Sequence, residues 1–163
     1  MFSRIKKVME GFKINFGKLK IDQLGFVFKD IEKQAKIMES IFGLSKFIFG
    51  DPRTKAVHYR GKESQVTSQL AFSRMGNAQV ELIKWIDGEC TYKEFIDQGR
   101  EGLHHVAMYV ENTDSYIQEL EKMEKGILQT GITFNIRVTY LDSEKKFGII
   151  LELLEKIRKR KRK

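Results

Sequence analysis

GREGLHHVAMYVEN, residues 99–112, is the stretch that decides the fold. It contains two of the three histidines of the 163-residue chain, His104 and His105, within an apolar run that is typical of a β-strand. Side chains alternate between the two faces of a strand, so His105 should share a face with Ala107 and Tyr109. We therefore expect His105 to reach a shared site and His104 to point to the opposite face.

The same order of elements occurs earlier in the chain. IDQLGFVF (21–28) is a strand-like run, Asp30 follows as a helix cap, and apolar residues recur at helical spacing over 31–43. In the second half, a strand over 103–110 precedes a helix predicted over 114–126. Further strand-like stretches complete each half, at 46–49, 66–74 and 78–85 in the first and at 127–131, 134–142 and 147–155 in the second.

Each half is therefore predicted to be a βαβββ module, and the fold class is α+β. The two tandem modules, 21–88 and 89–155, should form a curved, mostly antiparallel eight-stranded sheet around a cavity. A basic N-terminal extension (1–20) and a basic C-terminal tail (156–163) flank the body.

Four polar residues occupy equivalent positions of the two modules. Gln23 corresponds to His105 in the first strands, and Glu81 corresponds to Glu152 in the last strands. A lone carboxylate within an apolar strand is costly to bury unless it is paired or binds a metal. Alternation in a half-exposed strand also produces polar residues between apolar ones, but the repetition of the pair favours a functional site.

The composition limits the function classes. The net charge of +8 lies in the tails, because the last eight residues carry +7 and the first twenty carry +5, which leaves −4 on residues 21–155. The body is therefore not expected to bind nucleic acid, although the basic tail can do so non-specifically. Cys90 is the only cysteine, so no internal disulfide forms, and a cytoplasmic location is expected. No apolar window is long enough to span a membrane.

Four segments together resemble the vicinal oxygen chelate superfamily, which has the glyoxalase and bleomycin-resistance fold. GREGLHHVAMYVEN carries the most specific likeness, and the other segments are IDQLGFVFKDIEKQAKIMESIFGL, LAFSRMGNAQVELIKW and YLDSEKKFGIILELLE. The resemblance covers roughly residues 21–155. Within the superfamily, the chain is most similar to methylmalonyl-CoA epimerases and to glyoxalase I (lactoylglutathione lyase)-like proteins.

The resemblance implies a divalent metal ion (Zn, Ni, Co, Mn or Mg) held by Gln23, Glu81, His105 and Glu152. Epimerases usually have His where this chain has Gln23, whereas one class of glyoxalase I has Gln there. The overall layout is thus similar to an epimerase and the ligand set to a glyoxalase. Oxygen and imidazole ligands with open coordination positions suit such an ion.

The function implied is that of an isomerase or lyase that moves a proton next to a carbonyl. Glu152 is the expected base and Glu81 the second catalytic carboxylate. The implied substrate is a CoA thioester or a thiol hemithioacetal, and a homodimer is expected. Gln69 is placed in the same concavity, where its amide cannot act as a base.

Other interpretations remain beside this one. A non-catalytic small-molecule-binding protein of the bleomycin-resistance type would use the same cavity. The basic tail could instead contact nucleic acid, with the body as a scaffold. A ring-cleaving dioxygenase would need a second histidine ligand in place of Gln23. Cys90 has no histidine nearby in sequence, and His58 is expected in a polar surface loop.

Overall fold

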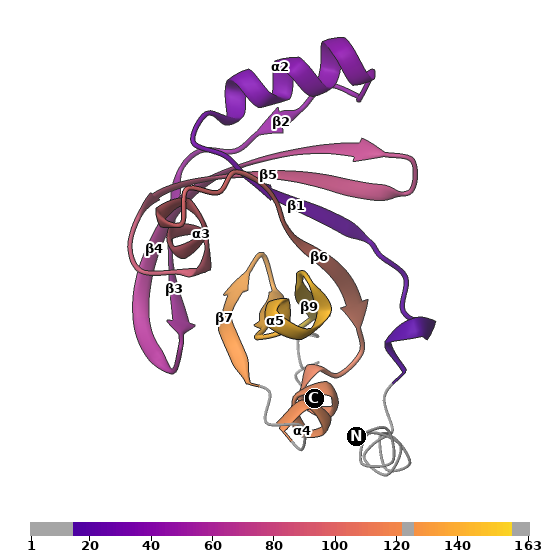
Figure 1. Cartoon of the computed structure of the whole chain (residues 1–163), viewed down its shortest axis with the longest axis vertical. Coiled ribbons are helices and arrows are strands. Elements are labelled where there is room, and N and C mark those ends of the chain that lie inside the picture. Colours follow the sequence, from indigo (N-terminus) through magenta and orange to yellow (C-terminus); the bar gives the residue numbers. More distant parts are fainter. Residues whose placement is uncertain (1–14, 122–125, 158–163) are drawn as a thin grey trace, which may run out of the picture.

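Eight strands close into a barrel-like ring, and a ninth extends the sheet at one edge (Figure 1). The computed structural model describes residues 15–121 and 126–157. The order in the sheet is β2-β4-β3-β7-β8-β9-β6-β1-β5, and pairing of β5 with β4 closes the ring. The elements are η1 (Phe16–Lys18), β1 (Gln23–Val27), α2 (Ile31–Phe42), β2 (Ile48–Phe49), β3 (Arg53–Tyr59), β4 (Lys62–Met75), β5 (Ala78–Asp87), α3 (Thr91–Asp97), β6 (Gly102–Val110), α4 (Thr113–Glu121), β7 (Ile127–Thr133), β8 (Ile136–Leu141), α5 (Glu144–Phe147) and β9 (Ile150–Lys156).

The strand register confirms the internal repeat. β1 pairs in parallel with β5 and aligns Gly25 with Glu81, while β6 pairs in parallel with β9 and aligns Ala107 with Glu152. All other strand pairs in the sheet are antiparallel. The first strands of the two modules, β1 and β6, lie side by side at the centre. The predicted α+β fold with two βαβββ modules is therefore correct.

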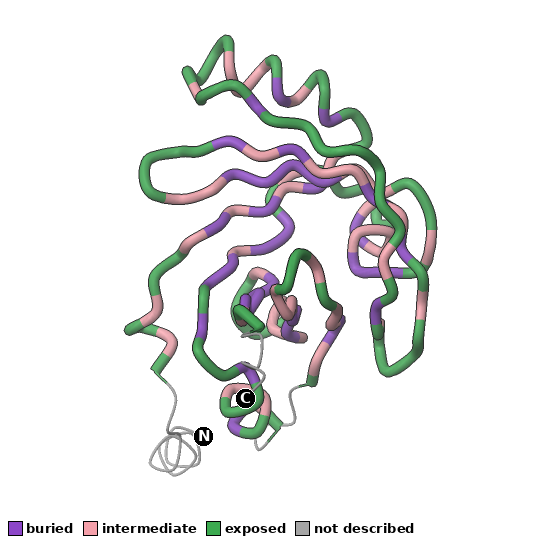
Figure 2. Tube along the Cα trace, turned by 180° about the vertical axis from the view of Figure 1, so that it is seen from behind, coloured by how far each residue is buried: buried purple, intermediate pink, exposed green. Residues whose placement is uncertain are grey.

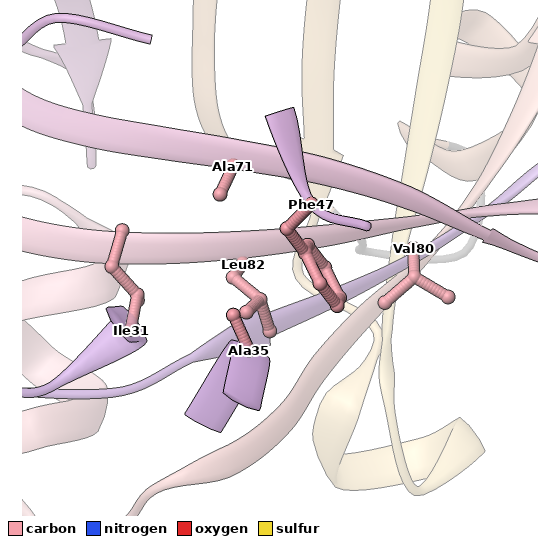
Figure 3. Close-up of a cluster of buried hydrophobic side chains, with 6 residues drawn as sticks. All are labelled: Ile31, Ala35, Phe47, Ala71, Val80 and Leu82. Carbon is pink, nitrogen blue, oxygen red and sulfur yellow. The ribbon is translucent and has the colours of Figure 1, made fainter. Parts of the chain in front are cut away.

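Each module buries its helix on the outer face of its own strands. In the first module, α2 places Ile31 and Ala35 against Leu82 of β5 and Ala71 of β4 (Figure 3). The Asp30 carboxylate caps this helix as predicted, by accepting a hydrogen bond from the Lys33 amide at 2.9 Å. In the second module, α4 packs its apolar side chains on β6 and β9 in the same way. The inner faces of the strands thus remain free to line a cavity.

The segment between the modules forms a helix that the sequence did not predict. α3 inserts Tyr92 and Phe95 among the inward-facing residues at one end of the ring. Cys90 immediately precedes it and is 1% exposed. This short helix closes the end of the barrel and supplies part of the cavity wall.

Several predicted boundaries are wrong. The stretch 46–49 contributes only the two-residue edge strand β2. The strand that follows β1 in the ring, in chain order, is β3, which the sequence pattern missed. His58 therefore lies on a strand and not in a loop, although it is exposed as expected. The polar stretch 143–146 contains the start of the short helix α5, and the end of the helix predicted over 114–126 falls partly outside the described residues.

Buried residues are concentrated along the central strands (Figure 2). The inner run of β9 is buried from Ile150 to Leu154, and the outer side of α2 and the hairpin turns are exposed. Most of both basic tails, residues 1–14 and 158–163, lies outside the described residues. Within residues 15–121 and 126–157, no helix has the length and apolar character needed to cross a membrane.

Candidate functional site

The ring encloses a cavity of about 250 Å³, and the predicted site residues meet at its wall. Gln23, Glu81 and Glu152 line it from β1, β5 and β9. His105 lies next to them on β6 and is fully buried. The structure thus brings together all four residues that the repeat pattern had paired.

His105 lies between the two carboxylates. Its Nε2 atom is 3.0 Å from Oε2 of Glu152 and 3.7 Å from Oε2 of Glu81. The Nε2–Oε2 pair is an ion pair when the imidazole is protonated, but neither of these buried atoms has a hydrogen-bond partner among the described residues. Buried polar atoms are normally satisfied, so such a pair indicates a site for a ligand.

Gln23 reaches the cavity from the opposite module. Its side-chain nitrogen donates a hydrogen bond of 2.7 Å to Oε1 of Gln79, which also lines the cavity. This bond uses the amide nitrogen and leaves the amide oxygen of Gln23 available as a donor atom to a cation or as an acceptor.

Gly25 makes room for the His105 ring. The two residues lie opposite each other in the β1–β6 pair, and a Cβ atom placed on Gly25 would be 1.9 Å from Cε1 and 2.1 Å from Nε2 of His105. Contacts this short do not occur between real atoms. The His105 ring can therefore occupy this position only because residue 25 has no side chain.

His104 does not point away from the site, which corrects the prediction from simple alternation. The register of β6 against β1 shifts at this point: His105 pairs with Gly25, Leu103 pairs with Phe26, and His104 is the extra residue. Such a bulge reorients a side chain. The Nδ1 atoms of the two histidines are consequently 3.0 Å apart.

Hydrogen bonds behind His105 fix the histidine pair. Nε2 of His104 lies 3.0 Å from the Thr91 hydroxyl at the start of α3, and the Thr91 amide donates to Gln129 at 3.0 Å. Burial lowers the pKa of His104 well below its usual value, so this ring is neutral. Its bond to Nδ1 of His105 leaves Nε2 of His105 to face the carboxylates.

The protonation states reflect burial in the cavity wall. Burial raises the pKa of Glu81 to about 7, although the neighbouring His105 opposes the shift. Burial alone would lower the pKa of His105, but Glu152 and Glu81 together raise it. Tyr92 and Tyr140 share a hydrogen bond of 2.7 Å, and burial raises the pKa of each phenol well above its usual value. Both phenols are therefore protonated: one donates to the other, and the second proton can be donated elsewhere.

The sequence did not single out several residues of the cavity. Tyr140 lies opposite Glu152 in the β8–β9 register, which the alternation of RVTYLD could have indicated. Tyr92 comes from the unpredicted helix α3, and Lys55 comes from the unpredicted strand β3. Burial lowers the pKa of Lys55.

Gln69 is not part of the cavity, contrary to prediction. The neighbouring positions Ser68 and Leu70 line it, whereas the Gln69 side chain donates to the Gly50 carbonyl at 3.2 Å. Cys90 is buried behind the cavity wall, and burial raises the pKa of its thiol to about 11. A protonated, buried thiol is not a nucleophile.

The donor set at the cavity wall fits a divalent cation. It combines an imidazole nitrogen with carboxylate and amide oxygens, which suit Zn, Mn, Co, Ni or Mg. As the side chains stand, no three His, Cys, Asp or Glu groups in the described part of the chain form a complete metal cluster. The two unsatisfied buried atoms of His105 and Glu152 are nevertheless what an ion would satisfy. Gln23, Glu81, His105 and Glu152 are the residues that could hold it.

Two βαβββ modules around a cavity, with paired polar residues on equivalent strands, define a class of duplicated βαβββ folds. The family model of the Glyoxalase/Bleomycin resistance protein/Dioxygenase superfamily matches residues 22–140. The chain belongs to this superfamily, as the sequence resemblance indicated. No curated protein sequence matches the chain significantly.

Solved structures share the fold at low sequence identity. A hypothetical protein from Bacillus halodurans C-125 has a TM-score of 0.62 and 19% identity, over 89% of this chain and 99% of that chain. Methylmalonyl-CoA epimerase from Mycobacterium tuberculosis has a TM-score of 0.58 and 16% identity, over 83% of this chain and 86% of that chain. A variant of the Streptomyces coelicolor methylmalonyl-CoA epimerase in complex with 2-nitronate-propionyl-CoA has a TM-score of 0.62 and 15% identity, over 86% and 98%.

Proposed function

We propose that this protein is a metal-dependent isomerase or lyase that moves a proton from or to the carbon next to a carbonyl group. The observation that carries the proposal is the pair of buried, unsatisfied atoms, Nε2 of His105 and Oε2 of Glu152, 3.0 Å apart at the cavity wall. Gln23 and Glu81 complete the set of donors. A divalent ion bound there would act as a Lewis acid on a substrate carbonyl.

The chain's own residues supply the proton transfer. Glu152 is the proposed base, because it lines the cavity and its unsatisfied oxygen belongs to the donor set. Glu81 is the second carboxylate, and its pKa of about 7 suits a group that both takes up and releases protons near neutral pH. The protonated phenol of Tyr140, next to Glu152 in the sheet, is placed to donate to an oxygen of the substrate.

Part of the remaining cavity wall is apolar. Val57, Val66, Leu70 and Val138 line it. These side chains exclude water from the reacting carbon and favour a substrate with a short apolar substituent there. A CoA thioester such as methylmalonyl-CoA, or a hemithioacetal of a small thiol, is the proposed substrate class.

Solvent exchange of the substrate α-proton tests the reaction. We expect the metal-loaded protein to incorporate deuterium from D₂O into methylmalonyl-CoA or into a glutathione hemithioacetal, and Glu152→Gln to lose this exchange by at least about 100-fold. Glu63→Gln, at an exposed position on β4, is the matched control and should exchange normally. Exchange by Glu152→Gln at the wild-type rate would remove Glu152 as the base.

Metal affinity tests the donor set. Isothermal titration of the metal-stripped protein with Zn, Ni, Co, Mn and Mg should give one site per chain. His105→Gln should weaken it by about 10–100-fold, whereas His58→Gln on the exposed face of β3 should leave it unchanged. No uptake of any of these ions would refute the proposed enzyme.

A non-catalytic small-molecule-binding protein is the second candidate. The incomplete grouping of His, Asp and Glu side chains in the described residues favours it, because a binding protein does not need a complete metal cluster. It predicts ligand binding that is independent of added metal and no α-proton exchange. The cytoplasmic location and the homodimer stay predictions.

A further inference from the structure

A strained aromatic residue stands at the rim of the cavity. β7 and β8 are joined by a two-residue turn, and both turn residues, Phe134 and Asn135, have positive φ, 47° and 62°. Asn tolerates this conformation, but a bulky residue such as Phe rarely adopts it. Phe134 is nevertheless 63% exposed, so it gains little from burial, and it lines the cavity. Strain of this kind at a cavity indicates a functional position.

One cation lies over this ring, and a second lines the same cavity. The Arg53 guanidinium carbon is 4.9 Å from the centre of the Phe134 ring. Lys55, two residues further along the same face of β3, lines the cavity. Neither side chain forms an ion pair with an acidic residue within residues 15–121 and 126–157. The rim therefore combines an exposed aromatic face with two cationic side chains, and the Lys55 charge also interacts with Glu81 and Glu152 in the cavity wall.

We propose that Phe134, Arg53 and Lys55 form a rim site that binds the part of the substrate that projects out of the cavity, and that this part carries a planar ring and phosphate groups. The ring stacks on Phe134, and Arg53 and Lys55 bind phosphate oxygens. This inference rests on the proposed function for the reacting end of the substrate. Of the two substrate classes, a CoA thioester has both features, whereas a glutathione hemithioacetal has neither.

The direct probe is adenosine 3′,5′-bisphosphate, which has a ring and phosphates but no thiol that could bind a metal. We expect the full-length protein to bind this probe in isothermal titration, and glutathione to bind more weakly. Phe134→Gly and Arg53→Ala should each lower the affinity of the protein for the probe by about tenfold. Added salt should reduce the affinity of the wild type more than that of Arg53→Ala, because the contact is ionic.

Matched controls separate binding from folding. Phe147→Ala removes another phenylalanine that is 63% exposed but does not line the cavity, and Arg74→Ala removes an arginine at the far β4–β5 turn. Both should bind the probe as the wild type does. Phe134→Gly should keep or raise the thermal midpoint, because Gly relieves the positive φ. Weaker binding by a protein that is no less stable therefore identifies a role in binding.

The outcomes are distinguishable from failure of the proposed function. Equal affinity of the probe for wild type, Phe134→Gly and Arg53→Ala would overturn the rim site, even if α-proton exchange is observed. Tighter binding of glutathione than of the probe would overturn it as well. Binding that depends on Phe134 and Arg53 supports the rim site, even in a protein that takes up no metal and exchanges no proton.

Discussion

Replacement of Gly25 by Ala tests whether the His105 ring needs the space that the absence of a side chain at Gly25 leaves. The new Cβ atom would lie 1.9 Å from the ring, whereas a normal contact needs about 3.5–4.0 Å. The φ of Gly25 is not in the left-handed region, so the backbone itself accepts Ala there. The whole cost therefore comes from the clash with a fully buried ring in a closed barrel.

The expected cost is large for a single methyl group. Overpacking in a tight interior costs about 1–3 kcal/mol, and a clash with a fully buried ring favours the upper end. We therefore expect Gly25→Ala to lose about 3 kcal/mol of unfolding free energy in urea titrations, or roughly 6–12 °C in midpoint. Gly50→Ala is the matched control, because the nearest atom to its Cβ, the Leu70 carbonyl oxygen, is 3.6 Å away. It should change stability by no more than about 0.5 kcal/mol.

A double-mutant cycle isolates the contact. In a His105→Ala background the ring is gone, so adding Gly25→Ala should cost nothing or stabilise by about 0.4–1 kcal/mol through the unfolded state. The coupling energy is then about 3 kcal/mol. If Gly25→Ala is equally destabilising with and without the ring, the reasoning from the 1.9 Å contact is refuted.

Three further predictions follow from the buried groups. Cys90, 1% exposed and with a pKa of about 11, should react with a disulfide reagent at pH 8 only as fast as the protein unfolds, and rapid labelling of the native protein would contradict this. In metal-free protein, the raised pKa of Glu81 means that the folded state favours the protonated carboxyl. The resulting contribution to the free energy of unfolding is present below about pH 4.5 and is lost as the pH rises through about 7. Glu81→Gln should therefore be more stable than wild type at pH 8, by up to about 3 kcal/mol, and equally stable at pH 4.5; a constant difference across the urea titrations would contradict this. Tyr140→Phe should cost about 1–3 kcal/mol because it leaves the buried Tyr92 hydroxyl without its partner, and adding Tyr92→Phe should recover part of the loss; an additive double variant would show that the hydrogen bond is not the cause.

The repeat was predictable because each module carries its own periodic signal. The helical and strand spacing of apolar residues can be recognised in each half without reference to the other. The equivalence of Gln23 with His105 and of Glu81 with Glu152 then follows from the order of the strands. The parallel registers of β1 with β5 and of β6 with β9 confirm that equivalence. Local pattern was sufficient wherever the apolar residues face the core.

The pattern failed where polar residues face inward. β3 carries Lys55 on the side that lines the cavity and His58 on the exposed side, so it shows no contrast between a buried and an exposed face. The bulge at His104 depends on how β6 registers against β1, a contact between residues about 80 positions apart, and no local signal specifies it. Both of these departures lie at the site, because Lys55 lines the cavity and His104 contacts His105.

The asymmetry of the site originates in a single pair of small residues. In the β1–β6 pair, the Gly25 position lies opposite His105 and the Ala107 position lies opposite Gln23. A rigid imidazole held close to the opposite strand needs a residue without a Cβ there, and Gly25 provides it. The Gln23 side chain, opposite Ala107, has more rotatable bonds than an imidazole and bonds to Gln79 instead. A two-fold repeat thus supplies two equivalent positions, and the residue across the strand pair decides which of them can present an imidazole.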